Sequence, residues 1–288
     1  MLSVTGVKYH EQEGRLEDLL KPSTGTIGHV GSVVYGFAVD TMAVAELEAR
    51  KLQHDPTEVL TRAVQPALWL LIFGEVLAQI RAIPTGKIPY IDFMTPGILA
   101  QSVLFISIFY GIAVIWERDL GILQKMLASP APRNALVLGK ALSASERGLS
   151  QALIIYLLAI LIGVHIDWNP VSVLGVLIVV ILGSALFSTF SLIIACIVRT
   201  RERFLGIGQL LTMPLFFASN AIYPISIMPH WLQAVSNVNP LTYMTDGLRA
   251  LMITGGVSTF GLVADIVALL GGIVVLVAIA AKLYPRVV

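Results

Sequence analysis

The sequence predicts an all-α integral membrane protein with six transmembrane helices, and three observations support this fold class. Hydrophobic residues make up 56% of the 288 residues and charged residues only 13%, whereas a soluble domain carries about 25% charged residues. The mean hydropathy is correspondingly high, at +0.83. The apolar residues occur in runs of roughly 20, the length that crosses a bilayer as a helix. Basic residues gather in alternate loops, as they do when a chain crosses a membrane repeatedly.

The six expected spans differ in how clearly they are marked. Five are continuous apolar runs, and the other, from Phe204 to Tyr223, contains Gly206, Gly208 and Pro214 but no charged residue. We include it because glycine and proline are better tolerated in membrane helices than in soluble ones. Within a membrane domain covering 55–288, we expect spans at about residues 57–83, 95–116, 145–166, 171–198, 204–223 and 260–282.

The distribution of Lys and Arg predicts which ends of the spans face the cytoplasm. With six spans, the N-terminal segment, the second and fourth loops and the C-terminal tail share one face. That face holds 16 of the 19 Lys and Arg residues, and the other holds only Arg81, Lys87 and Arg249. Because basic residues concentrate on the cytoplasmic side, we expect both termini in the cytoplasm.

Two segments precede the first span. Residues 1–34 are polar and rich in glycine, and we expect a mobile cytoplasmic tail without a cleavable signal sequence. Residues 35–54 mix apolar residues with Glu46, Glu48 and Arg50. This composition predicts an amphipathic helix at the inner membrane surface, with a solvated helix as the alternative.

The segment 224–259 is too apolar for an ordinary loop and too interrupted to span the membrane. Pro229 is expected to open one short helix, and Asn239-Pro240 a second one that Gly255-Gly256 would stop. Helices too short to cross a bilayer re-enter it or lie at its interface. We therefore predict a re-entrant helical hairpin on the outer side, between the fifth and sixth spans.

A charged helix is predicted at 117–128, between two spans. Glu117 and Asp119 fall in its first turn and Lys125 near its end, which suits the helix dipole. A Ser-Pro-Ala-Pro sequence then stops the helix, because proline cannot continue it.

The apolar stripe of this helix indicates what it contacts. The stripe repeats at helical spacing and consists of Leu120, Leu123 and Leu127. The charges of the helix cancel, whereas a helix that binds lipid headgroups is rich in Lys and Arg. This favours a groove on a second protein. Packing against the cytoplasmic ends of this chain itself is the alternative.

Several stretches resemble the permeases of type-2 ABC exporters, the class that includes daunorubicin-resistance permeases. They are RKLQHDPTEVLTRAVQPALWLLIFG at the first span, YIDFMTPGILAQSVLF and GIAVIWERDLGILQKMLASPAPRNALVLGKAL around the second, and NPLTYMTDGLRALM before the last. Together they cover most of residues 42–252. The resemblance implies that 117–128 is a coupling helix docking on a cytoplasmic ATPase, that 35–54 also touches that ATPase, and that the outer hairpin closes the exit of a two-fold dimer. The implied coupling residues are Glu117, Leu120, Gly121, Leu123 and Leu127.

The residues agree that nucleotide binding belongs to a partner. A phosphate-binding loop needs G-x-x-x-x-G-K followed by Ser or Thr. Here Gly86-Lys87 is followed by Ile88, and Gly139-Lys140 by Ala141. We therefore expect no cofactor or metal on this chain, with ATP and Mg²⁺ on a separate ATPase subunit. The net charge of +1 also argues against nucleic acid as a partner.

A polar stripe on the fifth span is the candidate translocation surface. It consists of Gln209, Thr212, Phe216 and Asn220. Glu75 is added because ionisable residues in or near spans are functional candidates, although a solvated or locally paired carboxylate is the alternative. The small residues Ser184, Ser188, Ser191 and Ala195 recur along the fourth span and predict close helix packing, with a polar lining for a substrate path as the alternative. Asp246 and Arg249 are expected to pair.

The sequence therefore predicts the membrane subunit of an ATP-driven exporter in the inner membrane of a prokaryote, a homodimer with two ATPase subunits. Its cargo is expected to be an amphipathic drug, as in multidrug resistance, or a lipid-like molecule. A lipid-linked glycan exporter is the leading alternative, followed by an ion-coupled transporter or a membrane scaffold. The second, fourth and fifth spans carry no ionisable residue, which disfavours a proton relay. The five histidines are scattered outside any catalytic motif, so we do not expect an enzyme.

Overall fold

The computed structural model describes residues 63–80, 83–86, 88–120, 133–198 and 200–283. All of these lie in the part of the chain, Lys51–Val288, that forms one unit. Their regular structure is helical, and the described residues contain no β-strand beyond one isolated antiparallel bridge between Ile166 and Ile253. The predicted tail 1–34 and the predicted helix 35–54 lie outside the described residues.

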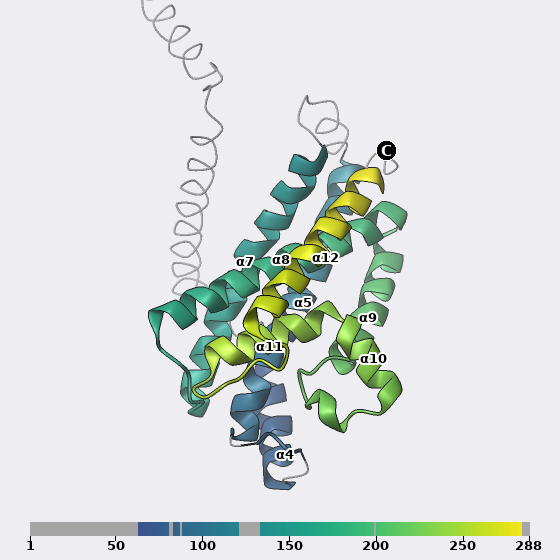
Figure 1. Ribbon diagram of the computed structural model, residues 1–288. Coiled ribbons are helices and arrows are strands. Elements are labelled where there is room, and N and C mark those ends of the chain that lie inside the picture. The colour runs from purple at the N-terminus through teal and green to yellow at the C-terminus, as the bar shows by residue number, and fades with distance from the viewer. Residues whose placement is uncertain (1–62, 81–82, 87, 121–132, 199, 284–288) are drawn as a thin grey trace, which may run out of the picture. The chain divides into compact units, whose positions relative to one another are not determined.

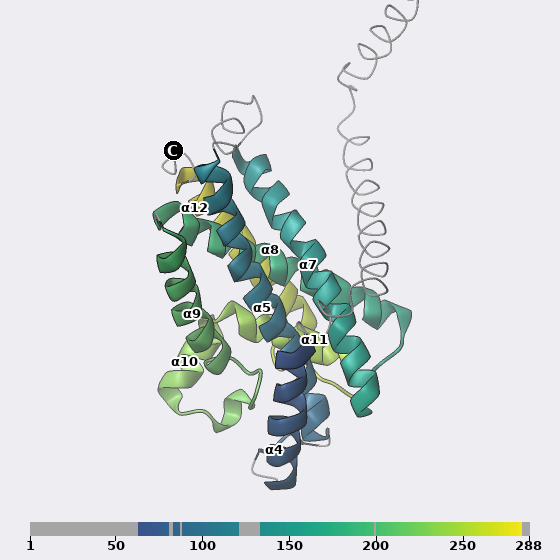
Figure 2. The ribbon, with the colours of Figure 1, turned by 180° about the vertical axis from the view of Figure 1, so that it is seen from behind.

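Four long helices build the bundle: α5 (Tyr90–Asp119), α7 (Arg133–Ile162), α8 (Pro170–Ile197) and α12 (Leu262–Leu283). Among the described residues, these four contain the stretches long and apolar enough to cross a membrane. Helix α8 is central, because it packs against α5, α7 and α12 and also against the shorter α11 (Figures 1 and 2). Four such helices in one unit are the architecture of a multi-pass membrane protein.

Small residues allow α8 to approach its neighbours closely. A Cβ atom on Gly148 of α7 would overlap the hydroxyl of Ser184, and one on Gly111 of α5 would overlap that of Ser191. Ser191 Oγ also donates a hydrogen bond to the carbonyl of Ile108. The predicted packing role of these serines is thus confirmed.

The boundaries of α5 and α7 differ from those predicted. The second span is expected to begin at about residue 95, where the apolar run begins, but α5 begins at Tyr90 and holds Pro96 inside. Helix α5 then continues to Asp119, so the structure shows no break at Glu117 between the span and the predicted coupling helix. Helix α7 begins at Arg133, well before the expected residue 145, because charged residues such as Lys140 and Arg147 interrupt the apolar pattern of its first turns without ending the helix.

The first predicted span, 57–83, is described only in part. Residues 63–80 are helical throughout, with a π-helical segment η1 (Trp69–Gly74) followed by α4 (Glu75–Ile80). The wider π turn was not predicted from the sequence. One face, with Leu70 and Gly74, is buried against α5. The other leaves large apolar side chains about half exposed: Leu68, Leu71, Ile72, Phe73 and Val76.

Between α8 and α12 the chain forms shorter helices. Helix α9 (Arg201–Phe217) is followed by a turn, a short 3-10 segment η2 (Ile225–Ile227), α10 (His230–Val238) and α11 (Pro240–Met252). The two short helices predicted after Pro229 and after Asn239 are confirmed. The predicted fifth span, 204–223, is too long, because α9 ends at Phe217. Helix α11 lies inside the fold, packed against α5, α8 and α12.

Helix α7 ends at a glycine for a conformational reason. Gly163 has φ of 83°, a left-handed conformation that is strained for residues with a Cβ. The amide of Gly163 bonds to Ile160 O at 3.2 Å, and that of Val164 to Ala159 O at 2.9 Å. These two bonds form a Schellman cap, which turns the chain into the loop leading to α8.

Candidate functional site

The candidate site is a buried polar cluster with an adjoining cavity at one end of the bundle. We call this the hairpin end: it comprises α10, α11 and the loops 163–169, 218–229 and 253–261. Burying a charged group in an apolar fold costs free energy unless the group is paired or hydrogen-bonded. The residues around a buried charged cluster must therefore supply these partners.

Asp246 of α11 is the centre of the cluster and is fully buried. Its Oδ1 accepts from Asn220 Nδ2 (3.2 Å) and Thr259 Oγ1 (3.0 Å). Its Oδ2 accepts from Ser258 Oγ (3.0 Å) and from the backbone amides of Thr259 (2.6 Å) and Phe260 (3.1 Å). Five neutral donors thus solvate this carboxylate, which attaches the loop 253–261 to α11.

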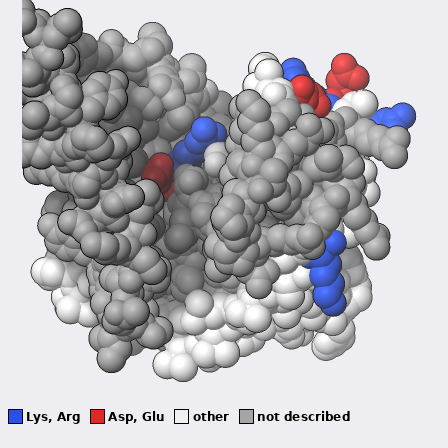
Figure 3. All heavy atoms as spheres, turned by 90° about the horizontal axis from the view of Figure 1, so that it is seen from above, with Lys and Arg blue, Asp and Glu red and all other residues white. Residues whose placement is uncertain are grey.

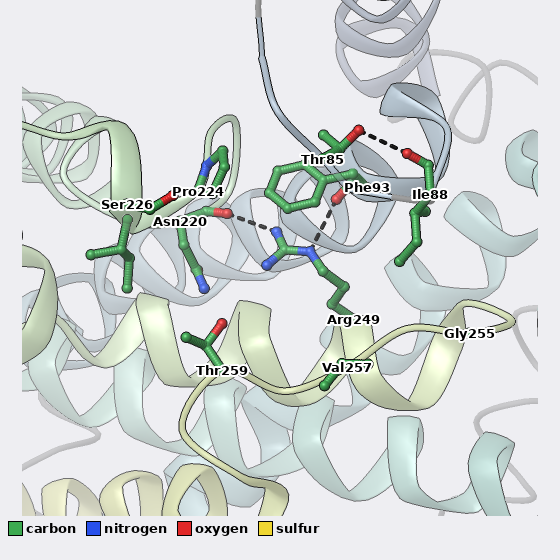
Figure 4. A pocket seen from close by; sticks show the side chains of 11 residues that line it. Thr85, Ile88, Phe93, Asn220, Pro224, Ser226, Arg249, Gly255, Val257 and Thr259 are labelled. Atoms are coloured by element: carbon green, nitrogen blue, oxygen red, sulfur yellow. Dashed lines mark hydrogen bonds between the residues drawn. The ribbon is translucent and has the colours of Figure 1, made fainter.

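Arg249 lies one turn further along α11 and is also buried. Its Nε donates to Phe93 O (3.3 Å) and its Nη2 to Asn220 O (2.7 Å), as Figure 4 shows. The guanidinium carbon lies 3.8 Å from the centre of the Phe93 ring, a cation–π contact. Burial lowers the pKa of Arg249 to about 10, against the opposing effect of Asp246, so the guanidinium stays charged at neutral pH.

The predicted pair of Asp246 and Arg249 is confirmed as an ion pair, with Nη1 and Oδ1 3.7 Å apart. This distance is too long for a hydrogen bond. The pair is therefore held mainly by neutral groups on each side, and its burial was not foreseen from the sequence.

Asp265 of α12 joins the cluster through Ser258. Ser258 Oγ lies 2.8 Å from Asp265 Oδ2, and it accepts from the amide of Gly261 at 2.7 Å. A hydroxyl has a single hydrogen, so Ser258 can donate to only one of the two carboxyl groups. Ser258 therefore lies between the two carboxyl groups and links α12 to α11.

Further contacts hold the loops of the hairpin end together. His165 Nδ1 lies 2.9 Å from Asp92 Oδ2 at the start of α5. The amide of Asp167 donates to Met252 O (2.9 Å), and that of Thr254 to His165 O (3.0 Å), around the Ile166–Ile253 bridge. The ends of α5, α7 and α11 are therefore connected to one another.

The C-terminal end of α9 is satisfied by side chains, which lets this helix stop inside the protein. Asn239 Nδ2 donates to Leu215 O (2.7 Å) and Ala218 O (3.2 Å). Ser219 Oγ donates to Phe216 O (2.7 Å), and the Tyr223 hydroxyl to Phe217 O. A helix leaves its last carbonyls without partners, and these three side chains supply donors for them.

A cavity of about 450 Å³ opens beside the cluster (Figure 4). Phe93 and Arg249 lie at its base, and residues of the surrounding loops form its walls. These are Thr85, Ile88, Asn220, Pro224, Ile225, Ser226, Gly255, Val257 and Thr259. A cavity of this size accommodates a small molecule or part of a lipid.

The structure separates the five predicted translocation residues. Gln209 and Glu75 are exposed, whereas Thr212, Phe216 and Asn220 are buried within the chain. Thr212 Oγ1 donates to Gly208 O in its own helix (2.8 Å), and the Phe216 ring meets that of Trp69 edge-on. Asn220 lies beyond the end of α9, so the prediction that all four polar-stripe residues share one helix is wrong. Pro214 and the side-chain donors end the helix before it.

The opposite end of the bundle carries the start of the predicted coupling segment. Arg201 of α9 pairs with Asp119 of α5 at 3.1 Å, and its guanidinium stacks 3.8 Å from the Trp116 ring. Figure 3 looks down on this end, where basic and acidic side chains both reach the surface. Leu120 is 68% exposed. The side chain of Glu117 is not described, and Gly121, Leu123 and Leu127 lie outside the described residues.

Comparison with known proteins decides the family. Residues 40–253 match the profile of the family described as ABC-2 type transporter. The chain belongs to the ABC-2 type transporter family. The ycf38 transport permease of Cyanophora paradoxa is 30% identical over 207 residues, covering 70% of each chain. The daunorubicin resistance ABC transporter permease protein DrrB1 of Streptomyces coeruleorubidus is 25% identical over 233 residues, covering 81% of each.

A third relative, the inner membrane transport permease YadH of Escherichia coli K12, is 23% identical over 188 residues, which cover 63% of this chain and 70% of YadH. The resemblance inferred from the residues is therefore confirmed, and this ABC-2 protein is a multi-pass permease of an ABC transporter.

The cavity and the burial of its charged base are not predicted by the sequence. One signal was present: Asp246, Arg249 and Asp265 are the only charged residues between Tyr223 and Lys282. Three charges isolated in an apolar segment indicate a shared buried site, and only the fold shows that they meet.

Proposed function

We propose that this ABC-2 permease is the membrane subunit of an ATP-driven exporter, which moves an amphipathic drug or a lipid-like molecule out of the cell with a separate ATP-binding subunit. The observation that supports the proposal most strongly is the family match over 40–253. The relative named for daunorubicin resistance favours an amphipathic cargo.

The fold suggests how work at the ATPase would reach the exit. Helix α5 is one continuous helix of 30 residues, with Asp119 at the end next to the proposed coupling segment and Phe93 at the hairpin end. Since Phe93 O accepts the hydrogen bond of Arg249, a shift of α5 along or about its axis would act directly on α11. A rigid helix tied at both ends can carry such a displacement.

The proposed complex contains a second copy of this chain and two ATPase subunits. The exposed apolar face of 63–80 and that of α9, where Leu205, Leu210 and Phe217 are 44% exposed or more, are available to lipid or to the second copy. We propose the inner membrane of a prokaryote as the location, although ycf38 relatives come from plastid-bearing algae.

The test of the proposal is co-purification in mild detergent with candidate ATPases, beginning with any encoded beside this chain. Leu123→Asp should abolish the complex, because a carboxylate cannot be buried in an apolar groove without a partner. Leu123→Met keeps the volume and apolarity and should retain it. ATPase activity that rises with an amphipathic cargo should follow the complex. Equal binding by the Asp and Met variants would contradict the coupling role.

Two alternatives make different predictions. A lipid-linked glycan exporter would show ATPase stimulation by a glycolipid and not by an apolar drug. An ion-coupled transporter or a scaffold would need no ATPase at all, so absence of any ATPase complex would favour these.

A further inference from the structure

We propose that the cavity at the hairpin end binds the anionic headgroup of an amphiphile, a phosphate or carboxylate, with Nη1 of Arg249 as the hydrogen-bond donor and the alkyl part of the ligand against the apolar walls.

Two of the three guanidinium nitrogens of Arg249 already have hydrogen-bond partners. Nε and Nη2 of Arg249 are occupied by the carbonyls of Phe93 and Asn220. Nη1 makes no hydrogen bond to any residue that the structure describes, and Asp246 Oδ1, at 3.7 Å, is beyond hydrogen-bond range. Arg249 nevertheless lines the cavity. Nη1 is therefore the donor left for an occupant of the cavity.

The guanidinium group of Arg249 is held rigidly. Two backbone carbonyls and the face of the Phe93 ring hold the guanidinium in place. A donor fixed in advance loses little conformational entropy when it captures a ligand. Figure 4 shows the planar group lying between Phe93 and Asn220, each bonded to it through a dashed contact.

The negative charge of Asp246 is stabilised largely without Arg249. Asp246 would compete with an anionic ligand if it depended on Arg249, but its two oxygens already accept five hydrogen bonds from neutral groups. Asp265, the other acidic group of the cluster, does not line the cavity. A charged N–H donor such as Nη1 binds a phosphate or carboxylate oxygen more strongly than a neutral donor does.

The walls of the cavity are partly apolar. Ile88, Pro224, Ile225 and Val257 present apolar surface, and the volume of about 450 Å³ exceeds what a bare phosphate needs. An apolar enclosure with one fixed cation is the pattern expected for a headgroup with its first few methylenes. The ligand could be a membrane phospholipid or a free amphiphile, and both would be held by the same donor.

The experiment uses the purified full-length chain and native mass spectrometry, with phosphatidylglycerol as the anionic lipid and phosphatidylcholine as the zwitterionic one. Val257→Trp fills the cavity mouth, since Val257 is 73% exposed, without removing a hydrogen bond of the cluster. Val274→Trp is the matched control, because Val274 of α12 is 68% exposed and does not line the cavity. The lipid-binding measurement requires neither ATP nor a partner subunit. A negative result would therefore leave the proposed transport function standing.

We expect the wild-type chain and Val274→Trp to retain one phosphatidylglycerol in preference to phosphatidylcholine. Val257→Trp should bind it at least about tenfold more weakly, the loss that one charge-assisted hydrogen bond produces. Arg249→Lys keeps the charge but replaces the rigid planar fork of three nitrogens by a single compact ammonium, and it should also lose the preference. Equal binding by Val257→Trp and the wild type, or no preference between the two lipids, would overturn the proposal.

Competition identifies the source of the ligand. If dodecyl phosphate displaces phosphatidylglycerol from the wild type but not from Val257→Trp, the site accepts free anionic amphiphiles, as a cargo site would. If dodecyl phosphate does not compete while the lipid preference holds, the site is specific for membrane phospholipid.

Discussion

Asp246 illustrates how a charge is accommodated in this apolar chain. Its carboxylate is not balanced chiefly by the nearby guanidinium but by hydroxyl, amide and backbone donors from the loops 218–229 and 253–261. Charged hydrogen bonds are stronger than neutral ones, so this one side chain fastens two loops and α11 together.

Asp246→Asn should destabilise the protein by about 2–4 kcal/mol, because it removes the charge from a buried pair and turns an amide NH₂ toward N–H donors. Thermal unfolding in detergent, followed by intrinsic fluorescence, measures the loss. Glu202→Gln, at an exposed position of α9, is the control and should leave the unfolding temperature nearly unchanged. A similar shift for both variants would contradict the role of Asp246.

Gly97 allows α5 to touch the turn after α9. A Cβ atom there would lie 2.7 Å from Ala221 Cα and still closer to its carbonyl oxygen. Gly97→Ala should therefore displace the turn that carries Asn220 and destabilise the fold by about 1–3 kcal/mol. Gly206→Ala, in α9 with nothing within 4 Å, should be neutral or slightly stabilising. Comparing the two unfolding temperatures distinguishes steric overlap from helix propensity.

At the scale of elements, the same dipeptide opens two helices for two different purposes. Asn169-Pro170 starts α8 and Asn239-Pro240 starts α11, and in each case the asparagine Oδ1 accepts from the second residue on, at 3.0 Å. Asn239 alone also uses its Nδ2, which caps the end of α9. One side chain therefore joins the end of one helix to the start of another.

Asn239→Asp should keep the N-cap of α11 but lose the donor to α9 and set a carboxylate against two carbonyls, at a cost of about 1–3 kcal/mol. Asn169→Asp is the matched control, since it keeps an equivalent cap at an exposed site, and should change stability little. Unfolding in detergent measures both. Equal effects would mean that the amide donors of Asn239 do not hold α9.

At the scale of the whole molecule, the arrangement of the helices can be tested by labelling. Cys196 is the only cysteine, so Cys196→Ala gives a background free of thiols. Thr200→Cys and Ser226→Cys place a thiol at exposed positions at opposite ends of the bundle. If the termini are cytoplasmic, a membrane-impermeant maleimide should label Ser226→Cys in intact cells and Thr200→Cys only after permeabilisation. The reverse pattern would invert the topology.

Much of the fold could be predicted because backbone polar groups must be hydrogen-bonded within the chain in the bilayer core, which favours long apolar helices. Helix α8 agrees with its predicted span almost to the residue, since Asn169-Pro170 opens a long uninterrupted apolar run. Prediction was weaker where charged residues interrupt the apolar pattern of a helix, as in the first turns of α7, or where a proline lies inside it, as in α5. The end of α9 was missed because the donors that stop it come from Asn239 and Tyr223, beyond the helix itself.

The sequence by itself determined that this is a helical membrane protein, that two short helices precede the last span, and that it resembles ABC-2 permeases. Those properties depend on composition, on the spacing of apolar residues and on local capping. Only the tertiary structure decided that Asp246, Arg249 and Asp265 meet, that Thr212, Phe216 and Asn220 are buried, and that a cavity with a charged base lies beside them. The reason is physical: a hydrogen bond between α5 and α11 joins residues 156 positions apart, and no local pattern records such a contact.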